Sequence, residues 1–360
     1  MIELALLLTL SGGCERQPLS ELLETEPRLA QILAAPRNYR VQVIVREIGP
    51  CKNRRTYRED AEYFYPASAI KLVAAAAAVH WAEENGVGLD ESLIVGEAPP
   101  MTLRENLDRT LVVSSNPGFN WLYDVAGVER MHSLLWAAGY SSFRMRHRFG
   151  ARAYPRSAQA TVPAVLAVDR QTLAPERTMT KALPKNVADD TLIGIAHVDP
   201  QSSERLPRPM PFAERNAITL GDLQGVLIDI VHPGLDGSTL PLSAKGRAAL
   251  RAQLERIVDE PPKPGAPPDR IRYKPLLAGV RRGVPQPERV HVESKAGRAY
   301  GFLVDNAYYR YRGRELFIAA AIYVNANGVI GDDTYEYESV GLRFFEALGE
   351  LLAREVFSPR

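Results

Sequence analysis

A serine and a lysine near the start of an alanine-rich segment have the spacing of a nucleophile and its base. Ser68 and Lys71 form a Ser-x-x-Lys at the start of segment 68–85, a predicted helix that ends at Gly86 and Gly88. Residues three apart share a helix face, so we expect the Lys71 amine to approach the Ser68 hydroxyl. The helix N-terminus would stabilise the alkoxide and the oxyanion formed after attack. About one Ser-x-x-Lys is expected by chance in a chain of this size, so the motif needs support from elsewhere.

Two later motifs provide that support. Ser114 and Asn116 lie in a predicted loop between helical segments, where a hydroxyl and a carboxamide can relay a proton and hold an amide carbonyl. Lys295, Ala296 and Gly297 follow a predicted strand at 290–293. Lys295 would supply a fixed positive charge, and Gly297 would let a substrate approach the strand backbone closely.

The three motifs, in this order, resemble those of class A β-lactamases and penicillin-binding proteins. The resemblance extends from the first predicted helix to the last. It implies that Ser68 is the acylated nucleophile and that Lys71 helps to deprotonate it. It also implies that Ser114 relays the proton to the leaving nitrogen, that Asn116 contacts the substrate's side-chain amide, and that Lys295 attracts the substrate carboxylate. The backbone N–H groups of Ser68 and Arg298 would form the oxyanion hole, beside Ala296 and Gly297 in the substrate-binding strand.

The chain departs from that family's pattern at three places. Ser115 stands where aspartate is usual, and Ala296 stands where a threonine or serine hydroxyl would bind the substrate carboxylate. No Glu-x-x-Leu-Asn occurs between Arg146 and Ala174. The nearest carboxylates are interpreted as solvated loop charges rather than as a base; they belong to Asp169, Glu176, Asp189 and Asp190.

The absence of a Glu-x-x-Leu-Asn motif affects the expected turnover. Acylation needs a nucleophile, a base and an oxyanion hole, whereas release of the acyl group also needs an activated water. Removing a positioned general base costs a factor of about 10² to 10⁴. We therefore expect a serine hydrolase that forms an acyl-enzyme on an amide or ester, either a β-lactam or a cell-wall peptide. The alternatives are a penicillin-binding or cell-envelope sensor protein without turnover, and a scaffold in which the motifs are relics.

The patterns along the chain predict an α+β fold. Predicted strands occur near both ends, at 40–47, 61–65, 290–293, 300–309 and 316–324. Predicted helices occupy 19–34, pieces of 103–139, 220–231, 243–258 and 335–356, and prolines interrupt 152–212. The arrangement favours an antiparallel sheet of about five strands, flanked by N- and C-terminal helices, with an inserted all-α lobe. The predicted domains are a leader at 1–17, a discontinuous α/β domain at 18–66 plus 213–360, and a helical lobe with a proline-rich insertion at 67–212.

Composition restricts the partners. The 360 residues are 46% hydrophobic and 24% charged, which excludes disorder throughout, and the formal net charge is +1. Such a balance does not favour nucleic acid, so we expect a small-molecule or peptidoglycan-derived substrate. The six histidines are dispersed and no paired-cysteine spacing occurs, so neither a metal site nor a cofactor is expected. The sequence leaves the oligomeric state open.

The N-terminus resembles a bacterial lipoprotein signal. An apolar stretch at 1–10 leads to Cys14 through Ser11, Gly12 and Gly13, although a basic n-region is missing. This predicts an exported protein, periplasmic or anchored to the membrane by a lipid on Cys14. The alternative is an ordinary apolar N-terminus, in which case Cys14 and Cys51 could form a disulfide.

Overall fold

Strands from the two ends of the chain form one antiparallel sheet. The computed structural model describes residues 16–49, 53–150, 160–168, 170–175, 183–184, 190–199, 202–259 and 271–358. Its five-stranded sheet has the order β13-β14-β15-β1-β2. The strands are β1 (Gln42–Ile48), β2 (Arg54–Tyr57), β13 (His291–Ala299), β14 (Phe302–Tyr311) and β15 (Arg314–Tyr323). Because β13 is an edge strand, its outer side is available to neighbouring segments.

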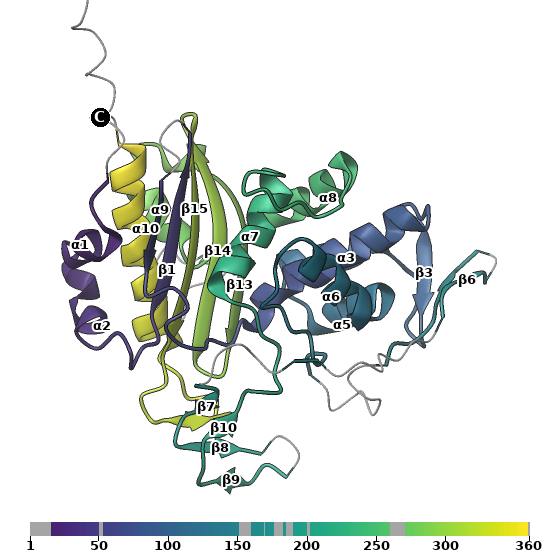
Figure 1. The fold of residues 1–360 in the computed structure, drawn as a ribbon, viewed down its shortest axis with the longest axis horizontal. Helices are drawn as coiled ribbons and strands as arrows, with labels where there is room; N and C mark the ends of the chain where they lie inside the picture. The colour runs from purple at the N-terminus through teal and green to yellow at the C-terminus, as the bar shows by residue number, and fades with distance from the viewer. Residues whose placement is uncertain are drawn as a thin grey trace, which may run out of the picture.

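One face of the sheet packs against helices from both termini (Figure 1). The helix α10 carries a stripe of buried residues that includes Phe345, Leu348 and Leu352, and this stripe joins sheet residues such as Val43 and Ile318 in one core cluster. The helices and turns of this layer are α1 (Leu19–Glu24), η1 (Pro27–Leu29), α2 (Ala30–Ala34), α9 (Leu277–Arg282), η5 (Pro287–Arg289), η6 (Tyr337–Gly341) and α10 (Leu342–Phe357).

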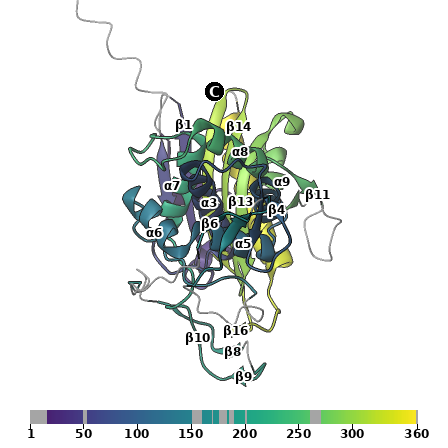
Figure 2. The same ribbon diagram turned by 90° about the vertical axis from the view of Figure 1, so that its right-hand side faces the viewer.

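The opposite face carries the helical part of the chain, which lies in front of the sheet in Figure 2. Its centre is α3, in which Ala74 to Ala78 are fully buried, and a helix that is apolar all round belongs in a core. The elements of this layer are η2 (Ala67–Ile70), α3 (Lys71–Glu84), α4 (Leu103–Leu107), η3 (Asp108–Val112), α5 (Asn116–Ala126), α6 (Val128–Ala137), α7 (Leu220–Val231) and α8 (Ala244–Leu254).

Short strands accompany these helices, which the sequence did not predict. They are β3 (Ser92–Val95), β4 (Met101–Thr102), β5 (Ala164–Leu166), β6 (Thr172–Ala174), β7 (Leu192–Ile193), β8 (Ala196–Val198), β9 (Arg205–Leu206), β10 (Met210–Pro211), β11 (Val258–Asp259), β12 (Ile271–Arg272) and β16 (Val329–Ile330). Most have two or three residues, and prolines limit the length of backbone pairing in the part of the chain that holds β5 to β10.

The first third of the chain differs from prediction at two neighbouring segments. Residues 61–65 form no strand. Instead their aromatic rings pack against other rings: the centroids of the Tyr63 and Tyr65 rings lie 5.8 and 5.4 Å from that of Phe212. The sheet's last strand is β2, which was not among the predicted strands. The exposed and half-buried residues of β2 fit an edge position, for which polarity is a poor guide. Cys14 and Cys51 lie outside the described residues, so the predictions that depend on them stay predictions.

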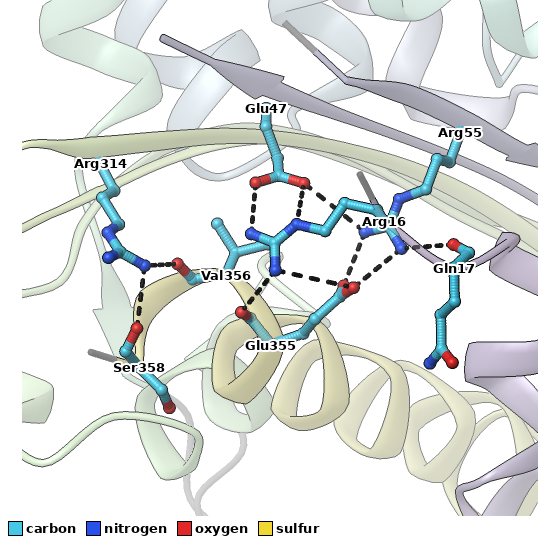
Figure 3. A network of polar contacts seen from close by, with 8 residues as sticks. All are labelled: Arg16, Gln17, Glu47, Arg55, Arg314, Glu355, Val356 and Ser358. Carbon is cyan, nitrogen blue, oxygen red and sulfur yellow. Dashed lines mark hydrogen bonds and ion pairs between the residues drawn. The ribbon is translucent and has the colours of Figure 1, made fainter. Parts of the chain in front are cut away.

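A polar network joins the N-terminal segment to the last helix (Figure 3). Arg55 on β2 donates to both carboxylate oxygens of Glu355, at 2.9 and 2.6 Å. Arg16 donates to both oxygens of Glu47 on β1, at 2.9 and 2.6 Å, and to the backbone oxygen of Glu355 at 3.2 Å. These contacts connect the segment before α1 to β1, β2 and α10, and so hold the two ends of the chain together.

Candidate active site

Ser68 lies in the tight turn that leads into α3. The turn η2 spans Ala67–Ile70, and α3 begins at Lys71. Ala67 and Ala69 are buried whereas Ser68 is half-buried. Ala67 adopts a φ of 45°, a left-handed conformation that costs energy for a residue with a Cβ and that recurs at functional sites. The strained turn therefore places the half-buried Ser68 at the entrance to a buried helix.

Gly297 brings the edge strand β13 against this turn. A Cβ at Gly297 would lie 2.3 Å from the carbonyl oxygen of Pro66 and 2.9 Å from the backbone nitrogen of Ser68. Real side chains do not make such contacts, so glycine is required for the approach. The backbone N–H of Ser68, which is predicted to form part of the oxyanion hole, thus lies directly beside β13.

Lys71 points toward the loop before α5. Its side chain is fully buried, and Nζ donates to the carbonyl oxygen of Ser114 at 2.5 Å and to Oδ1 of Asn116 at 2.8 Å. The Oγ of Ser114 lies 3.4 Å from the same nitrogen. The sequence predicted contact with Ser68, but within the described residues no hydrogen bond joins the Lys71 amine to the Ser68 hydroxyl. The reason is that the loop offers two strong acceptors to the buried amine.

Lys295 reaches the same hydroxyl from the other side. Its Nζ donates to Oγ of Ser114 at 3.0 Å and to the carbonyl oxygen of Ala296 at 3.0 Å. Ser114 itself adopts a φ of 58°, again left-handed, which turns the loop sharply before α5. The structure therefore brings together Ser114 and both lysines, with the hydroxyl of Ser114 between the two amines.

Burial changes the protonation of both amines. Burial, assisted by the positive charge of Lys295, lowers the pKa of Lys71 to about 6. Burial and the nearby Lys274 lower the pKa of Lys295 to about 7, against the opposing effect of Asp305. Lys71 is consequently mostly a neutral amine at pH 7, which is the form that can accept a proton.

The other predicted substrate-binding residues lie around this centre. Asn116 is exposed at the start of α5 and shares its amide oxygen with Lys71. Ala296 is buried and offers no hydroxyl. The exposed Arg298 donates to Glu338 at 3.2 Å and lies 5.1 Å from the Tyr337 ring centroid. The side chain of Arg298 is thus held at the start of η6.

Ser115 has a structural role that explains its departure from aspartate. Its Oγ accepts a hydrogen bond from the backbone N–H of Gly118 at 3.1 Å, so Ser115 is the N-cap of α5. Serine and aspartate cap helices about equally well. The substitution therefore preserves the geometry of the loop that carries Ser114 and Asn116.

Two residues of this site, Asn120 and Phe149, were not predicted from the sequence. Asn120 on α5 donates from Nδ2 to the carbonyl oxygen of Phe149 at 2.9 Å and accepts at Oδ1 from the Phe149 N–H at 3.0 Å. The centroid of the Phe149 ring lies 5.3 Å from Nζ of Lys71. A signal for Asn120 exists, because a carboxamide one helical turn after Asn116, on an apolar helix face, suggests a polar contact inside the protein.

The acidic residues that flank the insertion do not reach the centre where they are described. Asp190 accepts from Arg40 at 2.6 Å and from the Tyr63 N–H at 2.8 Å, so it fixes the aromatic segment. Asp169, Glu176 and Asp189 fall outside the described residues. Within the part of the chain that the structure describes, no three His, Cys, Asp or Glu side chains cluster as metal ligands, and no helix has the length and hydropathy of a membrane span.

The sequence matches a family model described as the β-lactamase enzyme family over residues 24–231, more than half of the chain. The chain belongs to this family. No match is found among curated protein sequences. Similar solved structures include a β-lactamase from Desulfarculus baarsii, with 18% identity, a TM-score of 0.58, and coverage of 92% of this chain and 98% of that one.

Two further solved structures give the same result for the fold. A β-lactamase from Xanthomonas campestris shows 16% identity and a TM-score of 0.56, with 93% of this chain and 99% of that chain covered. A class A β-lactamase from Mycobacterium abscessus shows 16% identity and a TM-score of 0.54, with coverage of 91% and 98%. The predicted fold class, an antiparallel sheet with an inserted helical region, is therefore confirmed. Identities this low bear on the fold and leave the substrate to be argued from the site.

Proposed function

We propose that this protein is a serine hydrolase that forms an acyl-enzyme through Ser68 on an amide or ester, either a β-lactam or a cell-wall peptide. One observation carries the proposal: the hydroxyl of Ser114 is held between two buried amines, one of which belongs to Lys71, directly after the turn that carries Ser68. Buried amines with lowered pKa values are expensive to maintain, and they are typical of sites that move protons.

The hydrogen bonds of Lys71 match the needs of a general base. A neutral amine has two N–H donors and one lone pair, and the two shortest contacts go to the acceptors Ser114 O and Asn116 Oδ1. The lone pair is then left for the proton of Ser68. In the proposed acylation, Oγ of Ser68 attacks the substrate carbonyl carbon and its proton passes to Lys71.

Collapse of the intermediate needs a proton on the leaving nitrogen. In the proposal, Ser114 donates its hydroxyl proton to that nitrogen as the C–N bond breaks, and it recovers a proton from Lys71. Protonated Lys295 orients the Ser114 hydroxyl and attracts an anionic group of the substrate. The backbone N–H of Ser68, beside Gly297, would stabilise the oxyanion.

Labelling with a fluorescent penicillin tests this proposal. We expect the wild-type protein to be labelled covalently, with the mass increment on the peptide that contains Ser68, and we expect no label on Ser68→Ala. Ser202→Ala, which changes an exposed serine elsewhere, is the matched control and should label normally. Absence of labelling of the wild type by penicillins and by small acyl esters would refute the proposal.

A penicillin-binding protein without turnover is the second candidate. Its support is the environment of Lys71. Among the described residues, the charge that shifts the pKa of the Lys71 amine is that of Lys295 and not that of a carboxylate. Such a protein would be acylated once per chain and would release little product. A burst of one equivalent without a steady phase would distinguish it from a fast hydrolase.

A further inference from the structure

The strand β13 contacts a third buried lysine, on the face that is turned away from Ser114. Lys274 lies before α9, and its Nζ donates to the carbonyl oxygen of Leu254 at 2.5 Å and to Oγ of Ser294 on β13 at 3.2 Å. Because successive residues of a strand point to opposite faces, Ser294 and Lys295 lie on opposite faces of the sheet. Lys274 is thus bound to β13 one residue before Lys295, from the other face.

A buried carboxylate lies on the same face as Ser294. Asp305 on β14 is fully buried and is the register partner of Ala296, the residue that follows Lys295. The side chains of register partners in an antiparallel pair lie on one face, with Cβ atoms about 4.5–5.5 Å apart. Oδ2 of Asp305 accepts from the backbone N–H of Leu276 at 3.1 Å, which ties the carboxylate to the segment that carries Lys274.

Both groups act on the amine of Lys295, with opposite sign. Nζ of Lys295 donates back to the carbonyl oxygen of Ala296, the residue that Asp305 faces across the sheet. Besides burial, which is the largest effect, the positive charge of Lys274 lowers the pKa of Lys295 and the negative charge of Asp305 raises it. The effect is mutual. Burial raises the pKa of Asp305, and the charges of Lys274 and Lys295 oppose that rise.

Other described charges reach this group from neighbouring elements. Lys71 on α3 faces Lys295 and carries little charge at pH 7, because its own pKa is about 6. Glu293 on β13 and Glu255 at the C-cap of α8 act on Lys274, where they oppose the effect of burial on its pKa. Among the described residues, the carboxylate on β14 is therefore the one that acts directly on Lys295.

We propose that Asp305 and Lys274 are positioning residues that act through Lys295: the carboxylate keeps the Lys295 amine charged, and Lys274 limits that effect. The inference rests on the proposed function, in which protonated Lys295 orients the Ser114 hydroxyl and attracts an anionic group of the substrate. The pair thereby sets the highest pH at which acylation is fast. Removal of the carboxylate and removal of the competing amine must then have opposite effects on Lys295, whereas a merely structural role would make both changes act alike.

NMR titration of the lysine amines tests this without a substrate. The signal of Lys295 is assigned by its loss in Lys295→Arg. We expect Asp305→Asn to lower the pKa of Lys295 and Lys274→Met to raise it, each by about 1 pH unit. Tyr309→Phe is the matched control, because it removes a buried hydroxyl on the same face of β14 that has no hydrogen-bond partner among the described residues, and it should leave the titration unchanged. Shifts of the same sign, or no shift in either variant, would overturn the inference.

The pH dependence of acylation tests the same opposition in the working protein. With a fluorescent penicillin, the alkaline limb of the acylation rate should move to lower pH in Asp305→Asn and to higher pH in Lys274→Met. At pH 7.5 we expect Asp305→Asn to be acylated about fivefold more slowly than the wild type, because a smaller fraction of Lys295 is protonated. An alkaline limb that stays in place in both variants would show that the pair does not control acylation.

A double variant decides the question if Asp305→Asn does not fold, which circular dichroism would show. Combining Asp305→Asn with Lys274→Met removes both buried charges, so neither is left without its partner. Because the two effects on Lys295 oppose each other, its pKa in the double variant should lie below that in Lys274→Met and close to that of the wild type. A pKa equal to that in Lys274→Met would mean that the carboxylate has no influence, and the inference would fail.

The two experiments separate this inference from the proposed function. If penicillins never acylate the wild type but the NMR shifts of Lys295 have opposite signs, the proposed function fails and the control of Lys295 by Asp305 and Lys274 stands. If the wild type is acylated on Ser68 but the NMR shifts share one sign, the proposed function stands and this inference fails.

Discussion

Lys295 donates a hydrogen bond from Nζ to Oγ of Ser114 at 3.0 Å, across a separation of 181 residues in the sequence. The contact joins the edge strand β13 to the loop before α5, and so it connects the two layers of the molecule at the site. On its other side, the hydroxyl of Ser114 faces Lys71, whose Nζ lies 3.4 Å from the Ser114 Oγ. A hydroxyl in this position can pass a proton only if both amines stay in place.

Replacing Ser114 should separate chemistry from folding. We expect Ser114→Ala to slow acylation of Ser68 by about 10²-fold or more, because the leaving nitrogen loses its proton donor. Stopped-flow fluorescence with a labelled penicillin measures the rate. Ser243→Ala is the control: it removes the N-cap of α8, costs about 1 kcal/mol of stability, and should leave acylation unchanged. Equal acylation rates for Ser114→Ala and the wild type would exclude the relay.

The acylation rate should show a narrow, bell-shaped dependence on pH. The rate should rise as Lys71 loses its proton near a pKa of about 6, and it should fall as Lys295 loses its charge near a pKa of about 7. Because the two amines interact, the two limbs belong to the pair. Lys295→Arg keeps its charge at all these pH values and should abolish the alkaline limb. Rates that stay flat between pH 5 and 9 would contradict both assignments.

The buried amine at position 71 should reduce stability at neutral pH. Its pKa of about 6 in the folded state is below the ordinary 10.5 of the unfolded chain. Between these values the unfolded state binds a proton that the folded state does not, so this group makes stability rise with pH by up to about 1.4 kcal/mol per pH unit. Lys71→Met removes that contribution.

Urea unfolding at two pH values tests this sign. Between pH 7 and pH 8.5 the free energy of unfolding of Lys71→Met, relative to the wild type, should fall by about 1 to 2 kcal/mol. The difference between the variants cancels the titrating groups that do not interact with Lys71, whereas Lys295 interacts with it and contributes a smaller part of the change. A relative stability that does not change with pH would mean that Lys71 keeps an ordinary pKa.

The network in Figure 3 should contribute to stability more than an exposed ion pair does. The Glu355 side chain is 14% exposed and that of its partner Arg55 is 9% exposed. We expect Glu355→Gln to cost about 2 kcal/mol in urea unfolding, since it leaves two buried guanidinium groups short of a counter-charge. Glu84→Gln, at a carboxylate that is 48% exposed, should cost less than about 1 kcal/mol. Equal costs would show that burial does not strengthen the network.

The sequence predicted the elements whose pattern is periodic and whose chemistry is local. The helix α7 matches its predicted bounds. Of the three consecutive predicted strands, β13 extends further than predicted, to Ala299, whereas β14 and β15 are displaced by no more than two residues at either end. Helix and strand periods are visible in a single segment, so such elements are readable without the fold. The strand β2 is polar because it is an edge, and so it lacks the apolar alternation that identifies a strand.

The contacts of the candidate site were less predictable than its members. The three motifs identified Ser68, Lys71, Ser114 and Lys295, but the direction of Lys71 depends on where the loop before α5 presents its oxygens. Phe149 was missed because a single aromatic residue just before the proline-rich stretch has no distinctive pattern. Its position over Lys71 depends on a pairing with Asn120, 29 residues away in the chain.

The close approach at Gly297 gives the most direct test of the site's geometry. A methyl group there would lie 2.3 Å from the carbonyl oxygen of Pro66, which is backbone and cannot rotate away. We expect Gly297→Ala to move β13 away from the turn of Ser68, to cost about 1 to 3 kcal/mol in stability, and to lower the acylation rate by at least about 10²-fold. Gly88→Ala, whose new methyl group would meet only the flexible Glu91 side chain, should leave the acylation rate unchanged. Full activity of Gly297→Ala would show that β13 need not touch this turn for the nucleophile to work.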